Sequence, residues 1–351
     1  MALRAALAIS LSCALAASAC AGFLYEGYNP QTIREEIGVP NAALDVQAGG
    51  LYSSAAYGGN VYAPDFSFTL PAGDAVRYSR LLVSWWGGAA SHTYDASVTV
   101  NGVLADQFTF GGVGDANPIY DPHATCVYGS GFGVWLTALD ITSQVTLGAL
   151  NTVQLDLQGD PFDGRCFHWQ VVTAYDTPTA GLLSYRLLEG LGYMRGTAAG
   201  SVPGWILLDR WMDLGDFTLD GLTQADLWMT YTHGVRDRWD WADLNSAGLG
   251  GNDIADSSTP SPYIDPVLYP NRSYFDFEYF DITPLLAPSG NTLGVHTTTG
   301  AEGGQVSMNV GPVVVAAYRS GQQEVIPEPC SLAILAAGLG AAALARRRRR
   351  R

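Results

Sequence analysis

The sequence predicts an all-β fold with two tandem β-sandwich, jelly-roll-like domains that arise from an internal duplication. Three observations predict it: short runs of alternating apolar and polar residues, clusters of Gly, Pro, Asn and Asp between these runs, and one block order that occurs twice. The composition agrees, since 41 glycines and 11% aromatic residues accompany only 15% charged residues. Segments 31–38 and 185–192 are compatible with one or two helical turns at most.

The duplication is clearest between segments 134–159 and 275–300, which both carry an Asp-Ile-Thr motif followed by Asn-Thr. The matched residues are Asp140, Thr142 and Asn151 in the first copy and Asp281, Thr283 and Asn291 in the second. An Asp and a Thr in such a motif can hydrogen-bond nearby backbone groups where a strand meets a turn. Copies of about 140 residues are too long for solenoid or propeller units, so each copy is expected to form a domain.

Two resemblances follow from these blocks. The Asp-Ile-Thr stretch, preceded by the Val-x-Val-Asn-Gly run at 98–102, resembles the jelly-roll modules of galactose-binding-like architecture found beside many glycosidases. That resemblance implies a sandwich fold and leaves the ligand open. The blocks at 81–102 and 313–318 also resemble an uncharacterised family of exported bacterial and archaeal repeat domains of unknown function.

The first 22 residues are typical of a secretory signal peptide. Arg4 is followed by an apolar stretch, and the Ala-Ser-Ala at 17–19 suits signal peptidase. Cleavage would make Cys20 the first residue. Lipidation of Cys20 is the alternative to plain secretion, although Ala17 stands where a lipobox usually has leucine.

The charge of the body excludes nucleic acid as a partner. All 18 basic residues are arginines, and seven of them lie in the leader or at the C-terminus, which leaves 11 against 33 acidic residues, or −22 (11 − 33). Such a surface repels nucleic acid and anionic lipid head groups. It is compatible with neutral sugars or divalent cations.

The C-terminus reads Pro327-Glu328-Pro329, then an apolar stretch at 330–345, then six arginines. As a helix the apolar stretch would span about 24 Å, so it predicts a transmembrane helix that is short for a hydrocarbon core of about 30 Å. The terminal cluster, which the positive-inside bias would hold in the cytoplasm, consists of Arg346, Arg347, Arg348, Arg349, Arg350 and Arg351.

This order of parts resembles the PEP-CTERM sorting signal. The resemblance implies that Pro327, Glu328 and Pro329 form the recognition motif of an exosortase and that the arginines retain the tail during processing. It implies transient anchoring in the inner membrane, followed by a place at the surface or in the matrix of a bacterium that makes exopolysaccharide. A plain C-terminal anchor is the alternative. The expected organisation is a signal peptide at 1–22, sandwiches at 23–178 and 179–320, and a sorting tail at 321–351.

Three groups of residues are candidates for special roles in the body. Cys126 and Cys166 form a candidate disulfide, with two buried free thiols as the alternative. Trp239 and Trp241, in a predicted loop among aspartates, are candidates for stacking on sugars, with core packing as the alternative. Trp85 and Trp86 alternate on one strand, so one of them must be buried. The same acidic loop is a candidate Ca²⁺ site or a solvated loop, and its carboxylates are Asp237, Asp240, Asp243, Asp253 and Asp256.

Enzymatic motifs are missing from the sequence. The five histidines show no metal-ligand spacing, and there is no Gly-x-Ser-x-Gly. No glutamate stands out as a catalytic acid, and Glu278 lies in an alternating strand. The sequence therefore predicts a non-catalytic, exosortase-processed surface or matrix protein without a cofactor. A carbohydrate-binding module acting on exopolysaccharide is the first alternative, and a glycoside-active enzyme is the second.

Overall fold

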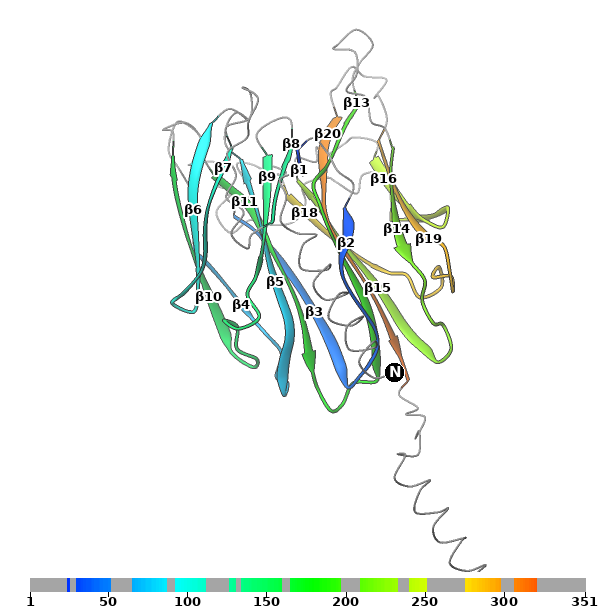
Figure 1. Cartoon of the computed structure of the whole chain (residues 1–351). Helices are drawn as coiled ribbons and strands as arrows, with labels where there is room; N and C mark the ends of the chain where they lie inside the picture. The colour runs from blue at the N-terminus through cyan, green and yellow to red at the C-terminus, as the bar shows by residue number, and fades with distance from the viewer. Residues whose placement is uncertain are drawn as a thin grey trace, which may run out of the picture.

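The computed structural model describes residues 24–25, 30–51, 65–86, 92–111, 126–130, 134–159, 165–196, 209–232, 240–250, 275–297 and 306–320. Within these ranges every regular element is a β-strand, so the prediction of an all-β fold is confirmed (Figure 1). The same ranges contain no helix with the length and apolarity needed to cross a membrane. The leader and the whole C-terminal tail lie outside the described residues.

Two sheets hold most strands of the first half. Inner sheet 1 has the order β1 (Leu24–Tyr25), β8 (Cys126–Ser130), β9 (Val134–Asp140), β5 (Ala75–Trp86), β11 (Arg165–Asp176), β3 (Ala42–Gly50). Outer sheet 1 has the order β4 (Phe66–Thr69), β10 (Leu150–Gly159), β6 (Thr93–Val100), β7 (Val103–Gly111). All of these pairs are antiparallel except β1 with β8.

Two further sheets hold the strands of the second half. Inner sheet 2 has the order β18 (Phe275–Asp281), β15 (Leu222–Thr232), β20 (Val306–Arg319), β12 (Leu182–Glu189), β2 (Gln31–Pro40), and β13 (Gly192–Gly196) also pairs with β20. Outer sheet 2 has the order β14 (Asp209–Gly215), β19 (Asn291–Thr297), β16 (Asp240–Leu244), β17 (Ala247–Leu249).

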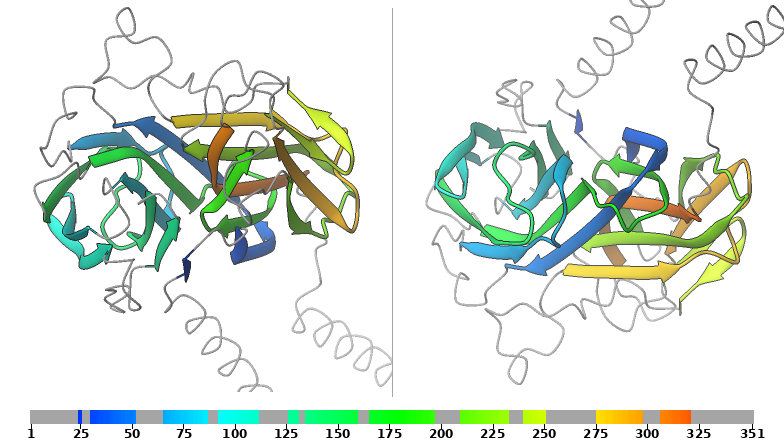
Figure 2. Two further views of the ribbon diagram at one scale, coloured as in Figure 1. Left: turned by 90° about the horizontal axis from the view of Figure 1, so that it is seen from above. Right: turned by 90° about the horizontal axis from the view of Figure 1, so that it is seen from below.

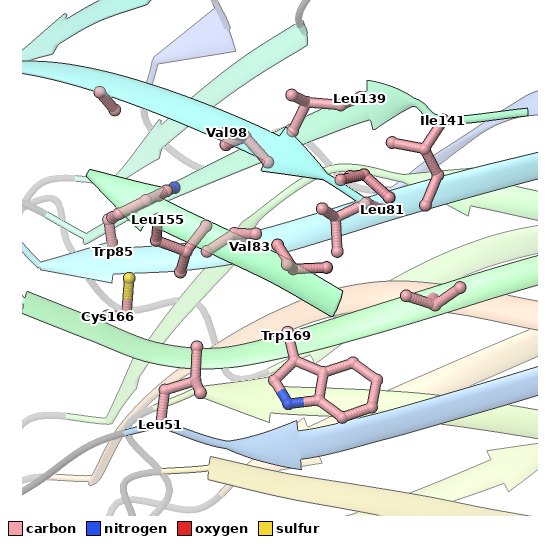
Figure 3. Close-up of a cluster of buried hydrophobic side chains, with 14 of the residues drawn as sticks. Leu51, Leu81, Val83, Trp85, Val98, Leu139, Ile141, Leu155, Cys166 and Trp169 are labelled. Atoms are coloured by element: carbon pink, nitrogen blue, oxygen red, sulfur yellow. The ribbon is translucent and has the colours of Figure 1, made fainter. Parts of the chain in front are cut away.

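The four sheets stack as outer 1, inner 1, inner 2, outer 2. One core lies between outer sheet 1 and inner sheet 1, and Trp85, Phe110 and Trp135 are fully buried in it. Figure 3 shows part of this core, including Trp85, Val83 and Leu155. A second core fills the space between inner sheet 2 and outer sheet 2. A third joins the inner sheets through residues such as Leu82 and Leu187. Both faces of each inner sheet are therefore buried, and the outer sheets lie at opposite sides of the molecule (Figures 1 and 2).

The two segments predicted as short helical turns are strands, so that prediction is wrong. Gln31–Pro40 and Leu182–Glu189 pair with each other as β2 and β12, with Arg186 opposite Glu35. Arg186 Nε donates to Glu35 Oε1 at 2.9 Å across this pair. The apolar residues of β12 are buried on both faces, because the strand lies inside a sheet covered on both sides. Burial of this kind removes the alternation by which a strand is recognised.

The predicted local hydrogen bond of the aspartate is confirmed in both Asp-Ile-Thr motifs, whereas each threonine hydroxyl bonds a backbone group that is distant in the sequence. Thr142 N–H donates to Asp140 Oδ1 at 2.9 Å, and the Thr142 hydroxyl accepts from Ser79 N–H at 2.9 Å. Thr283 N–H donates to Asp281 Oδ1 at 3.0 Å, and the Thr283 hydroxyl accepts from Ala225 N–H at 2.8 Å. The hydrogen bonds from Thr283 lower the pKa of the exposed Asp281 carboxyl.

A pair of asparagines closes the turn that follows each motif. Asn151 is fully buried, and its Oδ1 accepts from Asn101 Nδ2 at 2.8 Å and from Thr146 N–H at 2.7 Å. The counterpart Asn291 is also fully buried, and its Oδ1 accepts from Asn245 Nδ2 at 3.0 Å. Asn101 and Asn245 have φ of 51° and 53°, a left-handed conformation that asparagine tolerates well. Two turns far apart in the sequence thus use the same contacts.

Buried polar contacts connect the two inner sheets. Arg80 on β5 donates to both carboxylate oxygens of Glu189 on β12, at 2.7 and 3.0 Å. His168 on β11 lies 2.8 Å from the hydroxyl of Thr232 on β15 and stacks on Phe275 with ring centroids 4.2 Å apart. Burial lowers the pKa of His168 to about 3, so the ring is neutral.

The disulfide prediction is wrong. Cys166 is a free and fully buried thiol on β11, and burial raises its pKa. Cys126 begins β8, and strands β9 and β5 lie between β8 and β11 in the sheet. Three strand spacings amount to about 14 Å, which is twice the reach of a disulfide. The expectation for the tryptophan pair is confirmed: Trp85 is fully buried, and Trp86 is partly exposed.

Candidate functional site

The solvent-facing side of outer sheet 2 gathers aromatic and charged side chains. On β14 the alternation buries Met212 and Leu214 in the second core and turns Trp211 outward. On β16 it buries Ala242 and Leu244. Three strands contribute to the outward cluster, which we call the Trp–His face: Asp209, Trp211, Trp241, Asp243, Gly294 and His296.

Strand register forms two rows on the Trp–His face. Asp209 pairs with His296, which pairs with Trp241 on its other side. In the next row Trp211 pairs with Gly294, which pairs with Asp243. The second row thus has no side chain at its centre, and the neighbours of Gly294 converge over it.

Two carboxylates hold the imidazole of His296. The Nδ1 atom lies 2.7 Å from Asp209 Oδ1, and the Nε2 atom lies 2.6 Å from Asp243 Oδ2. Ionised carboxylates only accept hydrogen bonds, so the ring satisfies both contacts when both nitrogens carry protons. The orientation of the ring and of both carboxylates is then fixed before any ligand arrives.

Two indoles flank this imidazole. Trp241 stacks on His296 with ring centroids 5.1 Å apart and planes 20° apart, while Trp211 meets it edge-on at 5.0 Å. Trp211 is 50% exposed, an unusual amount for so large an apolar side chain on a strand. Contacts with both indoles restrict the imidazole to this orientation.

Gly294 is what allows the side chains to approach so closely. A Cβ at this position would lie 2.6 Å from His296 Nε2 and 2.8 Å from the Trp211 ring. Real Cβ atoms essentially never make such contacts, so any other residue would displace the indole or the imidazole. The face therefore depends on a glycine within a strand, where glycine has a conformational cost.

The structure brings together only part of the predicted acidic loop. Trp241 and Asp243 belong to the Trp–His face, on a strand and not in a loop as predicted. Asp240 is buried on the opposite side of β16 from Asp243, so these two carboxylates cannot share one calcium ion. Among the described residues no group of three or more His, Cys, Asp or Glu side chains suits a metal ion. Outside the described residues lie Trp239, Asp237, Asp253, Asp256, the Pro327–Pro329 motif and the terminal arginines.

Sequence reasoning missed Asp209, Trp211 and His296. One signal was present, because DRWMDLG at 209–215 alternates polar or aromatic residues with apolar ones and thus predicts a strand with Trp211 on its solvent side. Nothing local connected this strand with His296, which lies 85 residues after Trp211 (296 − 211).

A family comparison covers most of the described residues. Residues 25–310 match the model of a family described as "Protein of unknown function (DUF3344)". The chain belongs to this family. The matched range includes every strand of the Trp–His face and all of both inner sheets except Leu24 of β1 and residues 311–319 of β20. Comparison with curated proteins gives no significant match.

Solved structures resemble the chain only distantly. The major capsid protein P2 of bacteriophage PM2 is 10% identical, with 80% of this chain and 99% of that chain covered and a TM-score of 0.21. A peptide-N(4)-(N-acetyl-β-D-glucosaminyl) asparagine amidase is 9% identical, with 79% and 97% covered and a TM-score of 0.21. A β-porphyranase of Bacteroides plebeius is 9% identical, with 70% and 37% covered and a TM-score of 0.22. At these TM-scores none of the three carries an argument about function.

Proposed function

We propose that this protein is an exported, non-catalytic protein of the cell surface or extracellular matrix that binds polysaccharide through the Trp–His face. The observation that carries the proposal is a pair of tryptophans, one of them half exposed, fixed beside an imidazole that two carboxylates hold in place. The face lies on an outermost layer of the molecule, where an extended chain can reach it (Figure 1).

The chemistry of the Trp–His face suits sugars. The apolar face of a pyranose ring stacks on an indole, and covering about 100 Å² of apolar surface stabilises a complex by about 2.5 kcal/mol. Carboxylates accept hydrogen bonds from sugar hydroxyls, and the Asp209 side chain is 58% exposed and thus accessible. The two carboxylates of the face repel anionic ligands, which favours neutral sugars over uronates. Two stacked rings give a gross gain of about 5 kcal/mol and hence a dissociation constant of roughly millimolar order.

The experiment is titration of the purified protein with neutral cello-, manno- and galacto-oligosaccharides, followed by calorimetry and tryptophan fluorescence. We expect Trp211→Ala to weaken binding at least tenfold, because the half-exposed indole supplies the stacking surface. Tyr279→Ala is the matched control, since Tyr279 is also 50% exposed but lies on β18 of inner sheet 2. No new reducing ends should appear during prolonged incubation. Equal affinities for wild type, Trp211→Ala and Tyr279→Ala would refute the proposal.

We infer that the two halves are jelly-roll-like sandwiches from one duplicated ancestor, and the shared contacts around Asp140 and Asp281 support this inference. The paired turns of Asn151 and Asn291 support it as well. The proposed limits are about 23–178 and 179–320, with β2 exchanged into the second half's sheet.

We also propose, from the sequence alone, that the protein is exported and that its C-terminal tail is a sorting signal. The signal peptide, the Pro327–Pro329 motif, the apolar stretch as a short membrane helix and the arginine cluster support processing by signal peptidase and an exosortase. Prolines on both sides of Glu328 hold the motif extended, the form in which proteases take their substrates. Replacing Pro327, Glu328 and Pro329 by alanine should leave export intact and cause an uncut precursor to accumulate in the inner membrane. Release of a variant of wild-type size would contradict the sorting role.

A further inference from the structure

We propose that the first sandwich contains a second and separate binding site for a short neutral oligosaccharide, in a pocket of about 710 Å³ at the open edge of the sandwich. The lining residues come from the end of β3, the start of β4, the middle of β10 and β11: Gly49, Gly50, Leu51, Asp65, Phe66, Ser67, Thr152, Val153, Gln154 and Trp169. β3 is the edge strand of inner sheet 1, and β4 is the edge strand of outer sheet 1. The pocket therefore forms where the two sheets part. It goes beyond the proposed function, with which it shares only the ligand class.

Aromatic rings form the floor of the pocket. Phe66 and Trp169 stack with ring centroids 4.8 Å apart and planes 10° apart, and Phe68 supports the indole at 6.0 Å. Trp169 lies at the border of the first core near Leu51 (Figure 3). The ring pair is thus held firmly on its core side and offers an apolar surface toward the pocket.

Gly49 makes room for this floor. A Cβ at Gly49 would lie 2.8 Å from Trp169 Nε1 and 2.9 Å from the adjoining ring carbon, so only glycine lets the indole lie against β3. The Trp169 N–H donates no hydrogen bond to the described residues and is not among their buried unpartnered atoms, so it is accessible to a ligand. A ligand hydroxyl in the pocket would supply an acceptor for it.

Polar side chains form the rim. Ser67, Thr152 and Gln154 are exposed and alternate along their strands with the inward-facing Phe66 and Val153, so their two hydroxyls and one amide lie on the solvent side of the opening. Asp65 is the one charged residue among the described lining residues, and its Oδ1 accepts a hydrogen bond from Leu155 N–H at 3.2 Å.

The aromatic floor, the polar rim and the charge of the lining together indicate the class of ligand that the pocket would bind. An aromatic floor with a rim of donors and acceptors suits a ring that has an apolar face and hydroxyls at its edge. Among the described lining residues the one charged group is a carboxylate, which disfavours phosphates, uronates and nucleic acids. The volume lies within the range of about 300–1,000 Å³ of pockets that bind small molecules, and is enough for two or three sugar residues.

A second site changes what one molecule can do. The pocket lies between outer sheet 1 and inner sheet 1, and the Trp–His face lies on outer sheet 2, so inner sheet 2 separates the two sites. One polypeptide would then hold two polysaccharide segments at once, and binding to a matrix would exceed the affinity of either site through multivalency.

The experiment counts sites with the same neutral oligosaccharides, by calorimetry and nuclear magnetic resonance titration of the full exported chain. Wild type should bind two ligands, and a Trp211→Ala/Trp241→Ala variant should retain one. Ser67→Arg, which places a large side chain at the rim without touching the core, should remove that remaining site and lower affinity there at least tenfold. Gln158→Arg is the matched control, because Gln158 is exposed on β10 beyond the pocket lining.

The outcomes separate the two proposals. A Trp211→Ala/Trp241→Ala variant that binds none of the oligosaccharides would overturn the pocket site and leave the Trp–His face standing. One site in the wild type that Ser67→Arg removes would support the pocket and overturn the Trp–His face. Unchanged stoichiometry in Ser67→Arg would overturn the pocket site as well.

Discussion

Gly215 has no side chain, and this leaves room for an arginine of inner sheet 2 to contact outer sheet 2. Arg186 extends from β12 in inner sheet 2, and a Cβ on Gly215 would lie only 0.9 Å from its Nη1 atom. In the space left open, Arg186 Nη1 donates to the carbonyl of Leu214 at 2.5 Å, and the guanidinium lies 5.3 Å from the Phe217 ring centroid. Gly215 also has φ of +74°, where non-glycine residues are strained.

We expect Gly215→Ala to destabilise the protein by about 3–5 kcal/mol, because strain of about 1 kcal/mol adds to the loss of the Arg186 contacts. Gly290→Ala is the matched control: its φ is +69°, and a Cβ there would have no atom within 4 Å. It should cost about 1 kcal/mol. Urea unfolding of both variants gives the comparison. Equal losses would mean that the position of Arg186 adjusts freely.

The sequence pattern predicts some strands of this fold and fails to predict others. Strands with one wet face, such as β14, have a clear alternation, and the corner at Asp140 was predictable because its contacts are local. β12 was not predictable as a strand, since it is buried on both faces and its partner β2 lies about 150 residues away. The Trp–His face escaped prediction for a similar reason, because the role of His296 depends on Asp209 and Asp243 on separate strands.

His168 makes the contact between the inner sheets sensitive to acid. Its pKa is about 3 in the folded protein and 6.5 ordinarily, so between these values the unfolded chain binds a proton that the folded protein does not. Stability is therefore full above pH 6.5 and falls as the pH decreases, by about 1.4 kcal/mol per pH unit and roughly 2 kcal/mol at pH 5. Its contacts Thr232 and Phe275 do not titrate in this range.

The measurement is urea unfolding of wild type and His168→Gln at pH 7.5 and pH 5.0. Glutamine keeps a polar atom for Thr232 and does not titrate, so the variant should lose about 2 kcal/mol less stability than wild type on acidification. Carboxylates elsewhere contribute equally to both proteins and cancel in the difference. An identical loss in both would show that His168 is protonated without penalty.

The whole molecule is a stack of four sheets in which neither half is self-contained. The third core lies between the inner sheets, and the buried Arg80–Glu189 ion pair crosses it. The first long strand, β2, pairs in inner sheet 2, whereas β3 pairs in inner sheet 1. Separation of the halves would expose the apolar faces that the inner sheets turn toward each other and leave Arg80 or Glu189 without its partner.

We therefore expect fragments 23–178 and 179–320 to aggregate or remain unfolded when each is produced alone. Production of both fragments together should restore a soluble complex, because all interfaces are then complete. The intact chain should unfold in one calorimetric transition. Two separate transitions, or a soluble folded fragment, would contradict this interpretation of the stack.

The place of β2 also determines how the molecule would respond to pulling. β2 and β20 flank β12 and run in the same direction, with Gln31 opposite Glu189 and Arg319 opposite Leu182. The chain thus enters this three-strand unit at one end and leaves it at the other. Tension between the N-terminal and C-terminal sides would load the hydrogen bonds of both strand pairs in shear, all at once and not one after another. A chain held at its two ends would therefore resist force most strongly at these two strand pairs.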